Sequence, residues 1–162
     1  MRKLSILDRR LPALAMMVIT LSAGLLVGAA TEEQDAIRPS LADLMALTQL
    51  RQFKLWYAER VRNWKLVAYE LHQFQATIDR TEKLYPTASS IAHAALIKEK
   101  SEPAMIDLRR AISEENNSLF EAAFTRITAA CNGCHEAAGV SFIVVRVPTS
   151  SPFSNQRLDP VR

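Results

Sequence analysis

The pentapeptide Cys131-Asn132-Gly133-Cys134-His135 is the part of the chain whose residue types and spacing could do chemistry. Residues three apart share one face of a helix, so the two thiols could bond to the two vinyl groups of one porphyrin. His135 follows directly and could bind the iron through its imidazole. Because Cys-x-x-Cys-His is the attachment signature of c-type haem, the motif predicts one covalent haem c per chain, held by Cys131, Cys134 and His135.

Other uses of the two cysteines stay open at this stage. A redox dithiol normally lies near a helix N-terminus, where the helix dipole stabilises the thiolate, whereas these residues fall near the expected end of a helix. A zinc site needs four ligands, or three and a water, and no fourth partner is obvious. Unmodified buried thiols are the remaining alternative. These are the only cysteines in the chain.

The N-terminus predicts an export signal over residues 1–30. Four basic residues up to Arg10 precede an apolar run from Leu11 to Ala30, and an acidic segment follows. The run is about 20 residues long, enough to span a bilayer, so an uncleaved membrane anchor is the alternative. Cleavage after Ala30 would leave a periplasmic protein.

Charge argues against a nucleic-acid partner. The chain has 20 Lys and Arg against 17 Asp and Glu, but the excess belongs to the signal, and residues 31–162 are neutral overall. Binding to phosphates requires several basic side chains on one surface, and no such cluster is visible in the sequence.

Residues 31–139 are expected to form an all-α domain, an up-down-up-down bundle of four helices. Ser40 and Asp43 form a capping box for a first helix that ends near Val61. The second helix follows Asn63 and ends at Tyr85-Pro86. The third begins at Ser101-Glu102-Pro103, and residues 87–101 give only a weak helix signal from Ile91. The fourth, capped by Asn117 or Ser118, ends at Gly139.

Apolar residues at steps of three and four predict the buried face of each helix. The expected core positions, in chain order, are Ala46, Leu50, Phe53, Tyr57 and Val61; Trp64, Val67, Ala68, Leu71, Phe74 and Ile78; Met105, Leu108 and Ile112; and Phe120, Phe124, Ile127, Cys131, Cys134 and Ala138.

With its export signal, four helices and motif near the end of the last helix, the chain resembles the cytochrome c′ group. The segments Lys54–Ala58, Asn63-Trp64 and Ala68–Leu71, with the Pro148–Gln156 tail, are also similar to a little-characterised bacterial subset of cytochrome-like proteins. The resemblance implies a haem at one end of the bundle. The resemblance to cytochrome c′ covers residues 38 to 139. The tail departs from it, because cytochrome c′ usually stops soon after its motif.

Three residues could supply a sixth iron ligand at the expected haem end. Met45 resembles the position of the methionine ligand in some low-spin relatives of cytochrome c′, and it is the predicted metal ligand beside His135. His93, expected to face solvent, and Met105, expected on a core face, are alternatives, and iron bound by His135 alone is another. His72 is expected on the surface, away from the haem.

Coordination would decide the function. A methionine ligand favours an electron-transfer protein with a redox partner, whereas an open position favours binding of a small gas such as nitric oxide. The alternative from a different functional class is an exported helical module that carries no haem and binds a partner protein. No carboxylate pair, catalytic triad or phosphate loop indicates an enzyme.

Residues 140–162 are expected to form an extended C-terminal arm. The run Val140–Val147 is apolar and β-branched, and would leave a large exposed patch if it hung free. We expect it to lie across the end of the bundle and shield the haem from water, or to pair with a second chain in a homodimer.

Overall fold

A computed structural model of the chain describes residues 38–87, 91–150 and 156–160. The predicted signal over residues 1–30 lies outside these residues. The described residues from Ser40 onward belong to one compact unit. No helix found there is long and apolar enough to cross a membrane.

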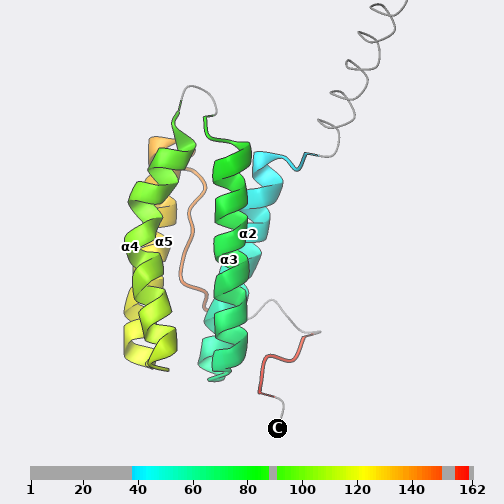
Figure 1. Cartoon of the computed structure of the whole chain (residues 1–162), viewed down its shortest axis with the longest axis vertical. Helices are drawn as coiled ribbons and strands as arrows, with labels where there is room; N and C mark the ends of the chain where they lie inside the picture. The colour runs from blue at the N-terminus through cyan, green and yellow to red at the C-terminus, as the bar shows by residue number, and fades with distance from the viewer. Residues whose placement is uncertain (1–37, 88–90, 151–155, 161–162) are drawn as a thin grey trace, which may run out of the picture. The chain divides into compact units, whose positions relative to one another are not determined.

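Four helices in sequence make up this unit: α2 (Leu41–Arg60), α3 (Trp64–Leu84), α4 (His93–Ser113) and α5 (Asn117–Ala137). Successive helices run in opposite directions, and each packs on its neighbour in the chain (Figure 1). The prediction of an all-α domain with four sequential, up-down helices is confirmed.

The start of α2 follows the predicted capping box. The Ser40 hydroxyl accepts a 3.1 Å hydrogen bond from the Asp43 amide, and the Asp43 carboxylate accepts one of 3.1 Å from the Ser40 amide. Together these bonds satisfy two amides that the first turn leaves without partners. The hydrogen bonds from Ser40 also lower the pKa of Asp43.

The α2–α3 and α4–α5 turns lie at the end of the bundle opposite Ser40, and both have the same backbone conformation and type of helix cap. Arg62 and Glu115, which follow α2 and α4, have left-handed backbones with φ of 55° and 48°. The next residue in each turn is an asparagine that caps the following helix: Asn63 and Asn116 accept backbone hydrogen bonds of 3.2 and 3.1 Å. Each connection therefore ends one helix and starts the next within a few residues.

Two predicted helix starts were wrong. The cap of α5 is Asn116, one residue before the earlier of the two predicted positions. The larger error concerns α4, which begins at His93 and contains Pro103. The proline lacks an amide and removes only one helical hydrogen bond, while the added turns bury His93 and Ile97. Burial in the bundle outweighs the local preference of proline for a helix start.

The predicted buried face of α2 was also wrong. Ala46 and Leu50 are exposed, and the buried residues are Leu44, Thr48, Gln52, Leu55, Ala58 and Glu59. Polar residues hold much of the core face, so counting apolar positions selected the wrong side. The predicted faces of α3, α4 and α5 are largely confirmed, except that Ala68 is exposed.

The core changes in character along the bundle. Toward the two turns it is aromatic, with ring centroids of Trp56 and Phe124 4.8 Å apart and those of Phe120 and Phe124 5.8 Å apart. Toward the other end it includes small polar residues, of which the buried threonines are Thr48, Thr77, Thr81 and Thr128. Each threonine hydroxyl donates to the carbonyl four residues earlier in its own helix, at 2.8 or 2.9 Å. Their polar groups are therefore satisfied within the helices.

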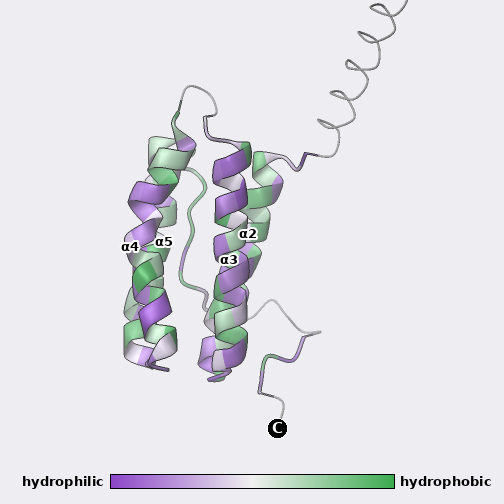
Figure 2. Ribbon diagram, in the orientation of Figure 1, coloured by the Kyte–Doolittle hydropathy of each residue, from purple (hydrophilic) through white to green (hydrophobic). Residues whose placement is uncertain are grey.

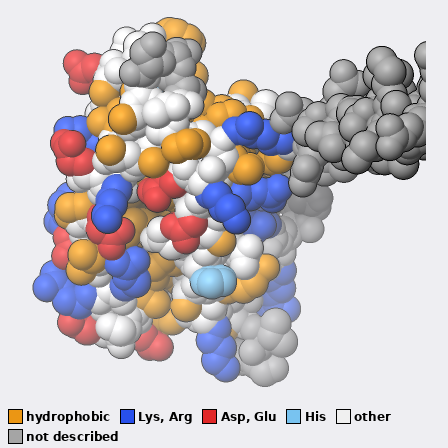
Figure 3. Space-filling view, turned by 45° about the horizontal axis from the view of Figure 1, so that its top comes forward, with side chains coloured by type: hydrophobic (Ala, Val, Ile, Leu, Met, Phe, Trp, Pro, Cys, Tyr) orange, Lys and Arg blue, Asp and Glu red, His pale blue; other side chains and the backbone are white. Residues whose placement is uncertain are grey.

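The outer surface is mixed. Hydrophilic residues dominate the visible faces of α3 and α4 (Figure 2). In Figure 3 basic and acidic side chains alternate with apolar ones over the face in view. This agrees with the balanced charge of the chain after residue 30.

The C-terminal arm runs along the bundle, contrary to the expectation that it crosses the end (Figure 1). Val147 packs against the core, and the Leu158 carbonyl accepts a 2.9 Å hydrogen bond from the side chain of Asn63, at the end opposite His135. The described part of the arm contains no strand. Within the single chain the apolar run is covered only in part, because Phe142 and Val144 are 80% and 66% exposed. Its pairing with a second chain stays a prediction.

Candidate functional site

The motif occupies the last two turns of α5. Cys131 and Cys134 are free thiols, and Cys134 packs against the core while Cys131 is half-buried. His135 is half-buried beside them. The helix continues through the motif and ends at Ala137, followed by Gly139 in the left-handed conformation that the sequence predicts, with φ of 74°.

Both thiols are desolvated. Burial raises the pKa of Cys131 to about 11, and the charge of a Cys134 thiolate would add to the shift. Burial also raises the pKa of Cys134, although nearby Lys100 opposes the change. Both side chains are therefore neutral thiols at pH 7. A redox-active Cys-x-x-Cys pair needs the opposite environment, one that lowers the thiol pKa.

The imidazole of His135 is held by the arm. Its Nδ1 lies 2.7 Å from the carbonyl oxygen of Ile143. A carbonyl can only accept, so Nδ1 carries a proton, and in the neutral ring Nε2 then carries the lone pair. His135 thus presents Nε2 as the nitrogen able to bind a metal, the arrangement usual for metal-binding histidines.

Asn132, inside the motif, binds the same arm. Its side-chain amide donates to the carbonyl of Val145 at 2.9 Å and accepts from the amide of Val145 at 2.8 Å. Nothing in the spacing of the motif could reveal this pairing, since the partner lies 13 residues away in a segment without secondary structure.

The register between α2 and α5 locates Met45. Gln52 contacts Thr128, and Trp56 contacts Phe124, so the two helices run antiparallel with these residues level. Continuing that register about two turns toward the start of α2 brings Met45 level with His135. Met45 is half-buried there. Its role as an iron ligand stays a prediction.

The other ligand candidates differ from expectation. His93 was expected to face solvent but is 8% exposed, and its Nδ1 lies 3.1 Å from the carbonyl of Ile91. Met105 was expected near the haem end, yet α4 begins ten residues before Pro103, so Met105 lies in mid-helix and is 1% exposed in the core. His72 is exposed, as predicted.

The donor set fits a covalent haem. Two free thiols lie three residues apart on one helix, the next residue offers an imidazole Nε2, and the buried Thr128 lies one turn before the motif. Within the described ranges, no group of three or more His, Cys, Asp and Glu side chains is arranged to hold a metal ion.

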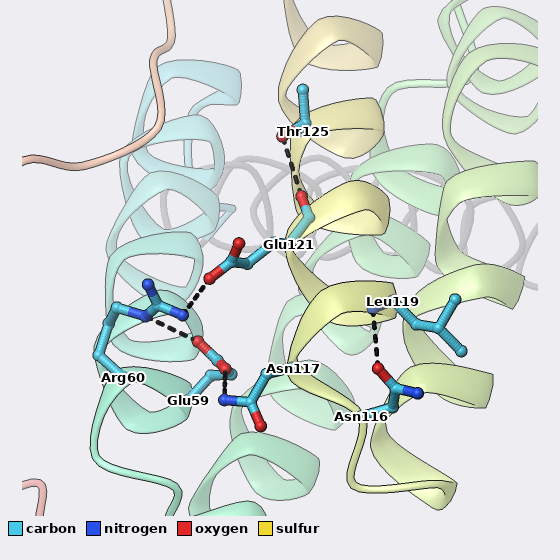
Figure 4. Close-up of polar contacts among 7 residues, drawn as sticks. All are labelled: Glu59, Arg60, Asn116, Asn117, Leu119, Glu121 and Thr125. Carbon is cyan, nitrogen blue, oxygen red and sulfur yellow. Dashed lines mark hydrogen bonds and ion pairs between the residues drawn. The ribbon is translucent and has the colours of Figure 1, made fainter.

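A second polar cluster, which sequence reasoning missed, lies far from the motif. The carboxylate of Glu59 is fully buried and accepts hydrogen bonds from Arg60, at 2.9 Å, and from Asn117 (Figure 4). Arg60 also pairs with Glu121 and stacks over Trp56, with its guanidinium 4.8 Å from the ring centroid. The partners come from α2 and α5, so this cluster joins the two helices.

Comparison with known proteins adds no relative: no protein-family model matches the chain, and neither a curated protein nor a solved structure shows significant similarity to it.

Proposed function

We propose that this chain is an exported electron-transfer protein that carries one covalent haem c on Cys131, Cys134 and His135. The observation that carries the proposal is the Cys-x-x-Cys-His motif on one helix, with both thiols free and His135 Nε2 available. The four-helix fold with its motif near the end of the last helix supports a likeness to cytochrome c′. The predicted signal over residues 1–30 supports a periplasmic location.

Each residue of the site would have its own role in holding the haem. Cys131 and Cys134 would anchor the porphyrin through thioethers, and His135 would bind the iron through Nε2. Met45, level with His135, would provide the sixth ligand. The haem supplies the one-electron chemistry when bound. A methionine ligand beside the imidazole would suit exchange of electrons with a redox partner protein and not catalysis on a substrate.

The test is expression of the full chain with c-type haem maturation machinery. We expect a haem that resists acid-acetone extraction and a pyridine haemochrome spectrum shifted by thioether formation. Cys131→Ala and Cys134→Ala should each retain one thioether, and the double variant should carry no covalent haem. The exposed Thr125 on the same helix provides a control, since Thr125→Ala should leave attachment unchanged.

Three results would overturn the proposal. Wild-type chain without covalent haem removes the basis for electron transfer and leaves a haem-free module. Haem that stays covalently bound in the double cysteine variant shows that attachment occurs elsewhere. Wild-type protein with haem but without reversible one-electron reduction also contradicts the assigned function.

A further inference from the structure

The beginning of the arm is tied to the last turns of α5 by polar contacts. The Val140 amide donates to the His135 carbonyl at 2.8 Å, and the Ile143 amide donates to the Val140 carbonyl at 2.9 Å. Asn132 then pairs with both backbone groups of Val145. Its side-chain amide thus makes the pair of hydrogen bonds that the backbone of a neighbouring β-strand would make.

Hydrophobic burial does not hold this segment in place. Phe142, Ile143 and Val144 are 80%, 49% and 66% exposed. Ordering each of these residues costs conformational entropy that their side chains do not recover by packing. The hydrogen bonds to α5 must therefore fix the path of the backbone here, and Asn132 supplies two of the side-chain bonds among them.

The result of this path is the contact at His135. Ile143 lies two residues before Val145, and its carbonyl oxygen comes to 2.7 Å from His135 Nδ1. A backbone carbonyl at this position fixes which nitrogen carries the proton and how the ring is turned. Second-sphere acceptors of this kind also raise the basicity of the metal-binding nitrogen.

We propose that Asn132 is a positioning residue for the iron ligand. By pinning Val145, it holds the Ile143 carbonyl against His135 and so sets the orientation and basicity of Nε2. This inference rests on the proposed haem function. A more basic ligand stabilises ferric iron over ferrous iron, so the contact lowers the reduction potential.

The experiment uses the haem-loaded full chain and the variant Asn132→Leu, which is neutral and close in size but makes neither hydrogen bond. Its reduction potential should move to a more positive value. In the reduced protein, the His135 Nδ1 proton should exchange with water about tenfold faster, the factor expected from loss of one ordinary hydrogen bond. Both measurements report on the imidazole rather than on turnover.

Phe142→Ala is the matched control, because it trims a side chain that is 80% exposed and leaves the backbone contacts intact. We expect wild-type proton exchange and potential. If Asn132→Leu does not fold, Val145→Pro breaks the pairing from the arm side by removing the amide that binds Asn132.

The outcomes separate the two proposals. Wild-type chain without covalent haem refutes the proposed function. Haem-loaded Asn132→Leu with the potential and exchange rate of wild type refutes the positioning role alone. Equal changes in Asn132→Leu and Phe142→Ala also refute it, since the arm would then act by shielding the haem with its side chains.

Discussion

The side-chain amide of Gln52 donates a 3.0 Å hydrogen bond to the hydroxyl of Thr128, inside the bundle and one turn before Cys131. Gln52 is 3% exposed and Thr128 is 6% exposed. The bond joins α2 to α5 one helical turn from the motif. It also shows why the apolar pattern failed for α2, in which a glutamine occupies a core position that the pattern assigned to solvent.

Gln52→Ala should destabilise the haem-free protein by about 2–3 kcal/mol, because it removes the bond and leaves a cavity. Gln52→Leu should cost under about 1 kcal/mol, since the volume is kept and Thr128 still donates to the Phe124 carbonyl. Urea unfolding measures both values. Equal losses in the two variants would show that filling the space contributes nothing.

The buried Glu59 gives a second stability prediction. Arg60→Ala should cost about 2 kcal/mol, because it leaves a fully buried carboxylate with Asn117 as its remaining side-chain partner (Figure 4). This loss of stability is smaller than that expected for a fully buried ion pair, because Arg60 is 39% exposed and water partly screens its charge.

Arg126→Ala is the control for this prediction. Arg126 pairs with Asp107 at 2.7 Å on the surface, so its loss should cost less than about 1 kcal/mol. Unfolding curves that give the same value for both arginine variants would mean that burial of Glu59 does not strengthen its pairing.

The sequence was most informative where side chains act on nearby backbone. Ser40, Asn63 and Gly139 mark the ends of helices correctly, because a cap is a contact over three or four residues. The motif is equally local, so Cys131 and Cys134 could be placed together on one face of α5, where Cys134 packs against the core.

It was least informative where distant segments decide the structure. Pro103 reads as a helix start, and only packing of His93 and Ile97 in the bundle extends α4 beyond it. The path of the arm depends on pairing between Asn132 and Val145, which no periodicity encodes. For the same reason, the contact of His135 with Ile143 could not be predicted.

The thiol of Cys131 predicts a pH dependence for the haem-free chain. Its pKa is about 11 when folded, against 9.0 for the ordinary thiol, so the folded state favours the neutral form. The resulting stability is complete below pH 9 and is lost as the pH rises toward 11. The loss should amount to roughly 2–3 kcal/mol.

Urea unfolding at pH 8 and at pH 10.5 measures this effect, and Cys131→Ala is the comparison. Burial also raises the pKa of Tyr57, so part of any alkaline loss belongs to that hydroxyl and should persist in the variant. The difference between the two proteins isolates Cys131. Covalent haem attachment converts the thiol to a thioether, so it should also abolish the part of the alkaline loss of stability that is due to Cys131. Identical pH profiles for wild type and Cys131→Ala would contradict a desolvated thiol.

Met45 carries the prediction on which electron transfer depends. It lies level with His135 across the bundle, as the contacts Gln52–Thr128 and Trp56–Phe124 indicate. If its thioether sulfur binds the iron, wild-type protein is six-coordinate and low-spin. Met45→Ala should then convert the iron to the high-spin form and lower its reduction potential, because a methionine ligand favours ferrous iron.

Absorption spectra of the oxidised and reduced proteins, with a redox titration, measure both changes. Met105→Leu serves as the control, since Met105 is buried in mid-α4 and should not influence the iron. A high-spin spectrum in His93→Gln, with Met45→Ala unchanged, would assign the ligand to the buried His93 instead. High-spin iron already in the wild-type protein would mean that His135 binds alone, and the open position would then favour a small gas ligand over electron transfer.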